Sequence, residues 1–120
     1  LYDEVNDFEC VILVNGSSAS SSELLTATLS HYCGIKSVGT KTYGKGVAQI
    51  VLTYNNQKYE MYITNGKYYI PTEKNGNTVF ETNIHGVGLT PDIATEASGI
   101  YYMELDPCLT AAADYGFGRR

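Results

Sequence analysis

The sequence predicts an α/β domain in which a strand–helix–strand unit precedes a series of β-hairpins. A continuous apolar run, Cys10–Val14, is followed by a segment with helical spacing and then by a second apolar run, Ile35–Val38, the order typical of a strand–helix–strand unit. Further on, β-branched and aromatic runs alternate with turn signals. Eleven tyrosines and no tryptophan also favour half-buried strands. We therefore expect a mixed sheet with two helices and β-hairpins.

The first unit is bounded by clear signals. Cys10–Val14 is short, continuously apolar and followed by a glycine, which predicts a strand buried on both faces. A helix is expected over Ser21–Cys33, with Gly34 placed to end it. Ile35–Val38 then gives the second strand, and the crossover should be right-handed.

The remaining elements follow a glycine-rich loop over residues 39–46. The strands expected after it are Val47–Tyr54, Lys58–Thr64 and Lys67–Ile70. The turns expected between them are Asn55-Asn56 and Asn65-Gly66, and Pro71 should end the third strand. A small surface hairpin is expected over Thr72–Ile84, and a glycine-rich loop over His85–Pro91. A last helix is expected over Cys108–Tyr115, with Asp106 as N-cap and Pro107 at its first position.

Composition excludes several classes of function. The 120 residues form one domain or a piece of one. The net charge is −5, and no basic stripe interleaves with aromatic residues, so a nucleic-acid partner is not expected. The longest apolar run is far below the ~20 residues that a membrane span needs. The three cysteines show no zinc-site spacing and are expected to be small buried side chains. No cofactor or metal is predicted.

The serine-rich stretch Asn15–Glu23 joins the first strand to the first helix. Ser20 and Glu23 are spaced as a capping box. This arrangement puts hydroxyls and free N–H groups at the positive end of the helix dipole, where a developing negative charge is stabilised. Taken alone, the stretch also fits an ordinary N-cap.

The sequence does not support other catalytic motifs, and a serine–lysine pair remains. Gly39–Lys45 has the spacing of a phosphate loop, but Gly46 replaces the required Ser or Thr and a strand follows instead of a helix. For a Ser-His-Asp triad, His31 lies about 16 Å along the helix from Ser20, and nothing in the sequence places His85 near that serine. The Gly-x-Ser-x-Gly elbow is also missing. A serine–lysine dyad is a recognised variant of nucleophilic catalysis.

Two motifs stand in order along the chain, Asn-Gly-Ser-Ser-Ala-Ser-Ser-Ser-Glu at 15–23 and Gly-Thr-Lys-Thr-Tyr-Gly-Lys-Gly-Val-Ala-Gln at 39–49. Together they resemble the active-site core of the carboxyl-terminal processing peptidases, also called tail-specific proteases. The likeness continues at 68–72 (Tyr-Tyr-Ile-Pro-Thr), 86–93 and 106–109, so it covers about residues 10–115. The resemblance implies a crotonase/Clp-protease-like core fragment.

The resemblance also implies roles for individual residues. Ser20 matches the nucleophile, Lys45 the general base, and Gln49 the residue that orients the lysine. Ser21, where alanine is usual in the family, would offer its backbone N–H to the oxyanion. A free lysine with a pKa near ~10.4 is protonated at neutral pH, so such a base needs a desolvated amine, with Tyr43 and Val47 as apolar neighbours. We expect the Ser20 hydroxyl and the Lys45 amine to lie within hydrogen-bonding range.

By the same resemblance, the function is that of a serine endopeptidase that cleaves protein substrates, often near their C-termini. We expect residues 1–120 to form a single domain, the C-terminal part of a catalytic domain whose PDZ-like domain and N-terminal helices lie upstream. Such a piece should be nearly inactive alone and should self-associate through an exposed sheet edge. Family members mostly act outside the cytoplasm, which implies an extracytoplasmic location. A non-catalytic binding module on the same fold and an esterase remain alternatives.

Overall fold

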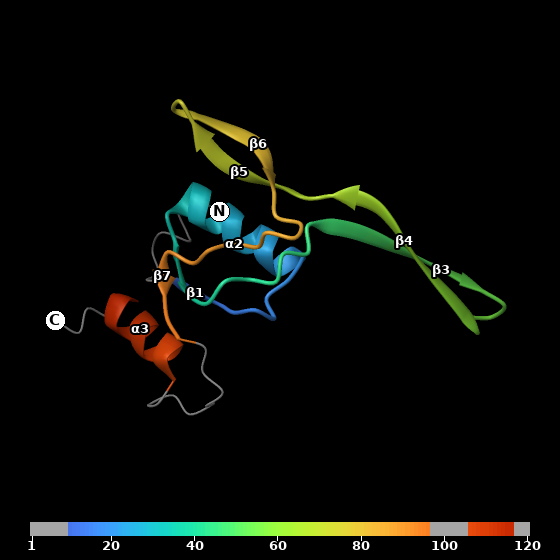
Figure 1. Cartoon of the computed structure of the whole chain (residues 1–120), viewed down its shortest axis with the longest axis horizontal. Coiled ribbons are helices and arrows are strands. Elements are labelled where there is room, and N and C mark those ends of the chain that lie inside the picture. The colour runs from blue at the N-terminus through green and yellow to red at the C-terminus, as the bar shows by residue number, and fades with distance from the viewer. Residues whose placement is uncertain (1–9, 97–105, 117–120) are drawn as a thin grey trace.

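Two helices and seven strands make up the part of the chain that the computed structural model describes, residues 10–96 and 106–116. In chain order they are β1 (Val11–Val14), α2 (Ser21–Cys33), β2 (Lys36–Gly39), β3 (Val47–Tyr54), β4 (Tyr59–Lys67), β5 (Tyr69–Lys74), β6 (Asn77–Asn83), β7 (Ile93–Ala94) and α3 (Pro107–Gly116). Figure 1 shows their arrangement. The architecture is α/β, as the sequence predicts.

A parallel sheet in the order β1-β2-β7 forms the base of the fold. β1 pairs with β2 from Val11↔Lys36 to Val14↔Gly39, and α2 is the crossover between them. The predicted strand–helix–strand unit is confirmed, and Gly34 ends the helix in the left-handed conformation. Because parallel strands end at the same edge of a sheet, the serine-rich turn after β1 and the glycine-rich loop after β2 start side by side.

The first strand differs from the expectation of burial on both faces. Val14 is 5% exposed, but Leu13 is 44% exposed. Side chains alternate between the two faces of a strand, so the face that carries Leu13 is only partly covered among the described residues.

A long two-stranded ribbon, β3 and β4, extends away from the body of the molecule (Figure 1). Its strands pair antiparallel from Val47↔Lys67 to Tyr54↔Tyr59. The turn expected at Asn65-Gly66 is wrong, because both residues lie within β4 and Gly66 pairs with Ala48. The partner strand continues at this point, with a register shift after Ala48, and its pairing overrides the local turn preference.

A second hairpin, β5 and β6, turns at Asn75 and Gly76, both with positive φ. The prediction that Pro71 ends a strand is wrong, because β5 continues through it to Lys74. The register shifts between Ile70 and Thr72, and such an irregularity is where a strand tolerates a residue without an N–H.

The core lies between α2 and this second hairpin. Ala27 on the helix packs with Ile70 on β5 and with Ile84, which is 1% exposed; Leu24 and Leu89 pack against them. Each fully buried aliphatic side chain contributes about 1.5–3 kcal/mol. The core therefore fixes the segment after β6 against the helix. The hairpin expected over Thr72–Ile84 is confirmed, with its turn at the expected tip, but its last residue, Ile84, is buried and not on the surface.

The strand pairing and the cysteines also depart from expectation. Parallel and antiparallel pairs lie in three separate sheets of the described structure, not in one mixed sheet. Cys10 is exposed, Cys33 and Cys108 are half-buried, and all three are free. At α3 the predicted N-cap is confirmed, since Asp106 Oδ1 accepts a hydrogen bond from the Cys108 N–H at 2.8 Å. Neither described helix is long and apolar enough to cross a membrane.

Candidate active site

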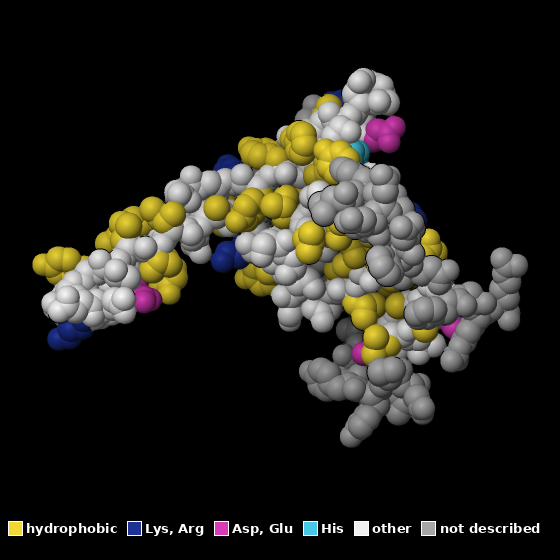
Figure 2. All heavy atoms as spheres, turned by 180° about the vertical axis from the view of Figure 1, so that it is seen from behind, with side chains coloured by type: hydrophobic (Ala, Val, Ile, Leu, Met, Phe, Trp, Pro, Cys, Tyr) yellow, Lys and Arg dark blue, Asp and Glu magenta, His cyan; other side chains and the backbone are white. Residues whose placement is uncertain are grey.

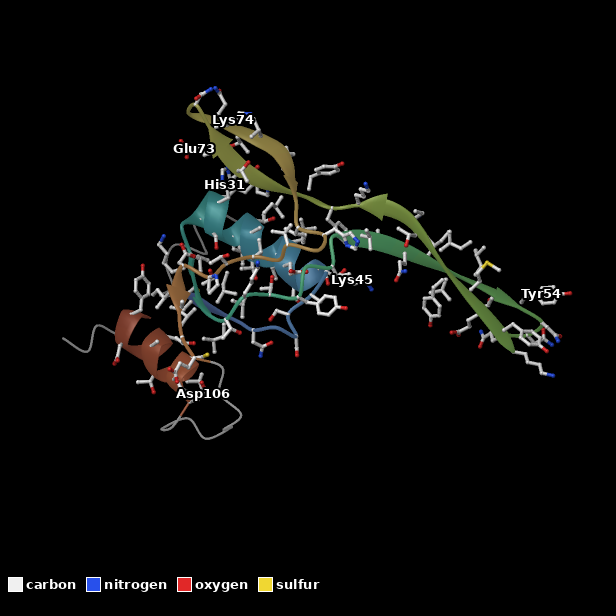
Figure 3. All side chains as sticks on the ribbon, in the orientation of Figure 1. His31, Lys45, Tyr54, Glu73, Lys74 and Asp106 are labelled. Carbon is white, nitrogen blue, oxygen red and sulfur yellow. The ribbon has the colours of Figure 1, made fainter. Side chains whose placement is uncertain are left out.

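The serine-rich turn and the glycine-rich loop pack against each other at the carboxyl edge of the parallel sheet. The Thr40 N–H donates to the Val14 carbonyl at 3.0 Å, and the Tyr43 N–H donates to the Ser18 carbonyl at 2.9 Å. Figure 3 shows Lys45 near the N-terminal end of α2, just before the start of β3. The two motifs that are separate in sequence therefore form one site.

Local hydrogen bonds shape the turn before the helix. The Asn15 side-chain oxygen accepts from the Ser17 N–H at 2.9 Å, and the Ser18 hydroxyl accepts from the Asn15 N–H at 3.1 Å. An asparagine side chain that bonds the backbone two residues on replaces a backbone turn. The turn thus brings the chain from the end of β1 to Ser20 within a few residues.

Ser20 is held in an unusual backbone conformation, with φ 57° and ψ −117°. A non-glycine residue with positive φ is uncommon, and such a sparsely populated conformation costs about 1–3 kcal/mol. The surrounding bonds impose it: the Ser20 N–H donates to Glu23 Oε2 at 2.8 Å, and its carbonyl accepts from the Leu24 N–H at 3.0 Å. Strain of this kind clusters at active sites.

Glu23 is the buried centre of the site, with 0% of its surface exposed. Its Oε2 accepts from the N–H groups of Ser20 (2.8 Å) and Lys45 (2.9 Å). Its Oε1 accepts from the Thr42 hydroxyl (2.5 Å) and the Gly44 N–H (2.7 Å). Burial alone raises the pKa of this carboxyl, but the four donors favour the ionised form and together hold the pKa below its ordinary value.

The shared carboxylate oxygen places Ser20 beside Lys45. Their backbone nitrogens lie 2.8 and 2.9 Å from the same atom, so they are at most 5.7 Å from each other. Both residues are half-buried. Within the described residues, however, no hydrogen bond joins the Ser20 hydroxyl to the Lys45 amine. Catalytic hydrogen bonds are often long in unliganded sites and shorten when substrate binds.

An open pocket of about 710 Å³ lies over this junction. It is lined by Gly16, Ser17, Ala19, Tyr43, Lys45, Val47 and His85. The expected apolar neighbours of Lys45, namely Tyr43 and Val47, do line the pocket with it. His85 comes from the segment after β6 and is exposed. In the described ranges, no three His, Cys, Asp or Glu side chains gather in a way that could hold a metal ion.

The other two predicted residues differ in placement. Ser21 is the first residue of α2, where a helix leaves the N–H without an intrahelical acceptor. Gln49 lies on β3 and is exposed, and its amide donates to the Thr64 hydroxyl at 3.4 Å. The structure therefore brings Ser20, Ser21 and Lys45 together but turns the Gln49 side chain toward the neighbouring strand. Its role in orienting the lysine stays a prediction.

Sequence reasoning missed most of what Glu23 does. The capping-box spacing predicted its bond to Ser20, but not the contacts with Thr42, Gly44 and Lys45. Those contacts span 19 to 22 residues, and local patterns carry no information about them. His85 was considered as a triad histidine, but only the packing of Ile84 in the core reveals that it reaches the pocket.

Comparison with known proteins identifies the family. The sequence model described as Peptidase family S41 matches residues 3–95. The chain is 37% identical over 93 residues to a probable CtpA-like serine protease of Staphylococcus aureus, which covers 78% of this chain and 17% of that protein. It is 31% identical over 96 residues to a carboxy-terminal-processing protease of Bartonella bacilliformis, with coverage of 80% and 20%.

A solved structure gives the same result. The photosystem II D1 C-terminal processing protease superimposes with a TM-score of 0.54 at 28% identity, over 72% of this chain and 20% of that one. The chain spans about a fifth of the length of the curated relatives named above. It belongs to peptidase family S41, a family of serine peptidases that includes C-terminal processing proteases.

Proposed function

We propose that the protein carrying this chain is a serine endopeptidase that cleaves protein substrates, often near their C-termini, through an acyl-enzyme on Ser20. Lys45 is the general base. The observation that carries the proposal is the Glu23 oxygen that accepts from the backbones of both residues. Family membership and the strained Ser20 backbone also support it.

The chemistry follows from this arrangement. The Lys45 amine takes the proton of the Ser20 hydroxyl as the serine oxygen attacks the carbonyl carbon of the peptide bond. The resulting oxyanion accepts a hydrogen bond from the Ser21 N–H at the start of α2. When the C–N bond breaks, the Lys45 ammonium returns the proton to the leaving amine. Water then hydrolyses the ester on Ser20, again with Lys45 as base.

The pocket suggests how substrate lies. Ala19, Tyr43 and Val47 line it with apolar groups, so a small or apolar side chain beside the scissile bond fits it best. The substrate backbone adds as a β-strand, and β1 and β7 are the outer strands of the parallel sheet that is described here.

We further propose that this α/β fold is the C-terminal part of a crotonase/Clp-protease-like catalytic core. The D1 processing protease supports its being a part of a larger protein, since the similarity covers 72% of this chain but only 20% of that one. A PDZ-like domain and a second oxyanion donor would belong to the rest of the protein. Losing one such donor costs about 10²–10³ in rate, so the chain alone should be nearly inactive. An extracytoplasmic location rests on the family resemblance only.

Self-association through an exposed sheet edge stays a prediction. We further propose that the chain associates through one face of the β3–β4 ribbon. The side chains on that face are Ile50, Leu52, Tyr54, Tyr59, Met61 and Ile63. They are 37–77% exposed and none is charged, and Figure 2 shows hydrophobic side chains along the ribbon. A standard interface takes roughly 800 Å² from each partner. The two tyrosines supply at most roughly 300–500 Å² of it, and the four other apolar side chains on this face add to that area.

The proposed function is tested by labelling the full-length protein with a serine-directed phosphonate and locating the adduct by mass spectrometry. We expect the adduct on Ser20, and we expect hydrolysis of an unstructured protein to disappear in Ser20→Ala. A full-length protein that neither labels nor hydrolyses would favour the binding-module alternative. Turnover of small esters without proteins would favour an esterase. Turnover by the isolated chain at the rate of the full-length protein would contradict its being a partial domain.

A further inference from the structure

Thr42 connects three parts of the site through one buried side chain. It is 5% exposed and lies three residues before Lys45 on the glycine-rich loop. Its hydroxyl donates to Glu23 Oε1 at 2.5 Å and accepts from the Leu89 N–H at 2.7 Å. Because Leu89 supplies the proton on one side, the single hydroxyl proton is directed at the carboxylate on the other. The Thr42 N–H also donates to the Leu89 carbonyl at 3.0 Å.

Gly44, the residue before Lys45, is also bonded to Glu23 and to the segment after β6. The Gly44 N–H donates to Glu23 Oε1 at 2.7 Å, and its carbonyl accepts from the Gly86 N–H at 2.9 Å. Gly44 has φ 88°, and a Cβ on it would lie 2.8 Å from the Gly88 nitrogen. The segment after β6 therefore packs directly on the backbone of the Lys45 loop, with no space for a side chain between them.

We propose that Thr42 is a positioning residue for the reaction: its hydroxyl fixes the Glu23 carboxylate against the segment Gly86–Leu89 and thereby sets where Lys45 stands relative to Ser20. The proposal rests on the proposed serine–lysine chemistry. Removing the hydroxyl leaves the Leu89 N–H without its acceptor and Glu23 Oε1 with one donor instead of two. The Thr42 side chain is buried and its hydroxyl faces Glu23 and Leu89, so substrate binding should change little.

The test compares three substitutions at this position in the full-length protein. Thr42→Val keeps the shape and removes the hydroxyl, and we expect kcat to fall at least ~10-fold with KM within about 2-fold. Thr42→Ser restores the donor and acceptor and should return kcat to within about 3-fold of wild type. Thr42→Cys has a thiol, a weaker donor and acceptor, in place of the hydroxyl. Its kcat should lie between those of the other two variants, and it replaces Thr42→Val in the test if the valine variant does not fold.

Thr26→Val is the matched control. Thr26 is also buried, at 6% exposure, but its hydroxyl donates along the helix to the Ser22 carbonyl. The same chemical change at the same depth should leave kcat within about 2-fold of wild type.

Phosphonate labelling of Ser20 separates the possible failures. We expect Thr42→Val to label at least ~10-fold more slowly than wild type, because the serine lacks a correctly placed base. Equal labelling rates for wild type and Thr42→Val would overturn the role of Thr42 and leave the proposed function standing. Thr42→Ser labelling as slowly as Thr42→Val would also overturn it, and so would a loss of kcat in Thr26→Val equal to that in Thr42→Val. A wild-type protein that does not label would overturn the proposed function and this role together.

Discussion

Ser20 and Glu23 face each other across the first turn of α2, where the Ser20 N–H donates to Glu23 Oε2 at 2.8 Å while the serine keeps a φ of 57°. The helix cap and the proposed nucleophile are thus the same residue. The carboxylate that completes the cap also accepts from Lys45, so a local stabilising device of the helix is part of the site.

Replacing Glu23 with glutamine should damage both stability and activity. The amide offers one acceptor oxygen where the carboxylate offers two, and its NH₂ group would face N–H donors. Donors buried without acceptors cost about 1–3 kcal/mol each, so we expect Glu23→Gln to lower the free energy of unfolding by about 2–4 kcal/mol. Urea denaturation measures this. Glu73→Gln, on the exposed part of β5, is the control and should change stability by less than about 0.5 kcal/mol.

The stability of the fold should fall in acid. Burial raises the pKa of Glu23 and of Asp92, the residue before β7, but hydrogen bonds outweigh it. Glu23 accepts the four bonds described above. Asp92 accepts from the Ser37 N–H and hydroxyl and from the Lys36 amine. Both pKa values therefore lie below the ordinary 4.5 and 3.8. Below about pH 5 the unfolded chain binds more protons than the folded chain, so the free energy of unfolding decreases as pH falls toward the folded pKa values.

Urea denaturation between pH 7 and pH 3 measures that dependence. The Glu23→Gln variant should show a shallower dependence because one of the two carboxyl groups no longer titrates. A free energy of unfolding that is constant, or that rises, on acidification would contradict the hydrogen-bonding of both carboxylates.

The identity of the base can be decided within the pocket. Lys45→Met should abolish turnover by the full-length protein, since the lysine is the proposed acceptor of the serine proton. His85→Gln should keep kcat within about 10-fold, because a residue that only lines the pocket affects binding more than chemistry. Lys41→Met, an exposed lysine on the same loop, controls for loss of charge and should behave as wild type. The opposite ranking of the first two variants would make His85 the base.

The strained backbone of Ser20 predicts that glycine is more stable than alanine at this position. Glycine adopts positive φ without a Cβ clash, so Ser20→Gly should be more stable than Ser20→Ala by about 1 kcal/mol. Both variants lack the hydroxyl and should be inactive. Thermal unfolding of the two variants measures the difference, and equal stabilities would mean that the backbone of Ser20 is not strained.

The ribbon face predicts the oligomeric state of the chain. Leu52→Lys places a charge in the middle of the apolar face, and we expect it to shift the chain toward monomer in light scattering. Thr53→Lys puts the same charge on the opposite face, where Thr53 pairs with Glu60, and should leave association unchanged. A wild-type chain that is monomeric at high concentration would contradict the proposed interface.

Local signals predicted the elements well and the distant contacts poorly. The apolar runs, the helical spacing and Gly34 gave β1, α2 and β2 nearly to the residue, and the Asp106 cap placed the start of α3. Predictions failed where pairing with another strand overrode a local preference, as at Asn65-Gly66 and Pro71. Leu13 was misjudged because a sequence run does not show how far the sheet is covered.

The site divides in the same way. The motifs predicted Ser20 and Lys45 as the proposed dyad, and the capping-box spacing predicted the bond from Ser20 to Glu23, which the structure contains. The links from Glu23 to Thr42 and from Thr42 to Leu89 depend on loops that meet only after the sheet and core have formed, so no sequence window contains them.

The buried Glu23 carboxylate takes its four hydrogen bonds from two separate segments, so the proposed active site forms only when both segments are in place. Until the helix cap and the lysine loop have both closed on Glu23, the attacking oxygen and its base belong to independently moving stretches of chain. A nascent or partly unfolded chain of the proposed protease therefore has no assembled site with which to cleave other proteins.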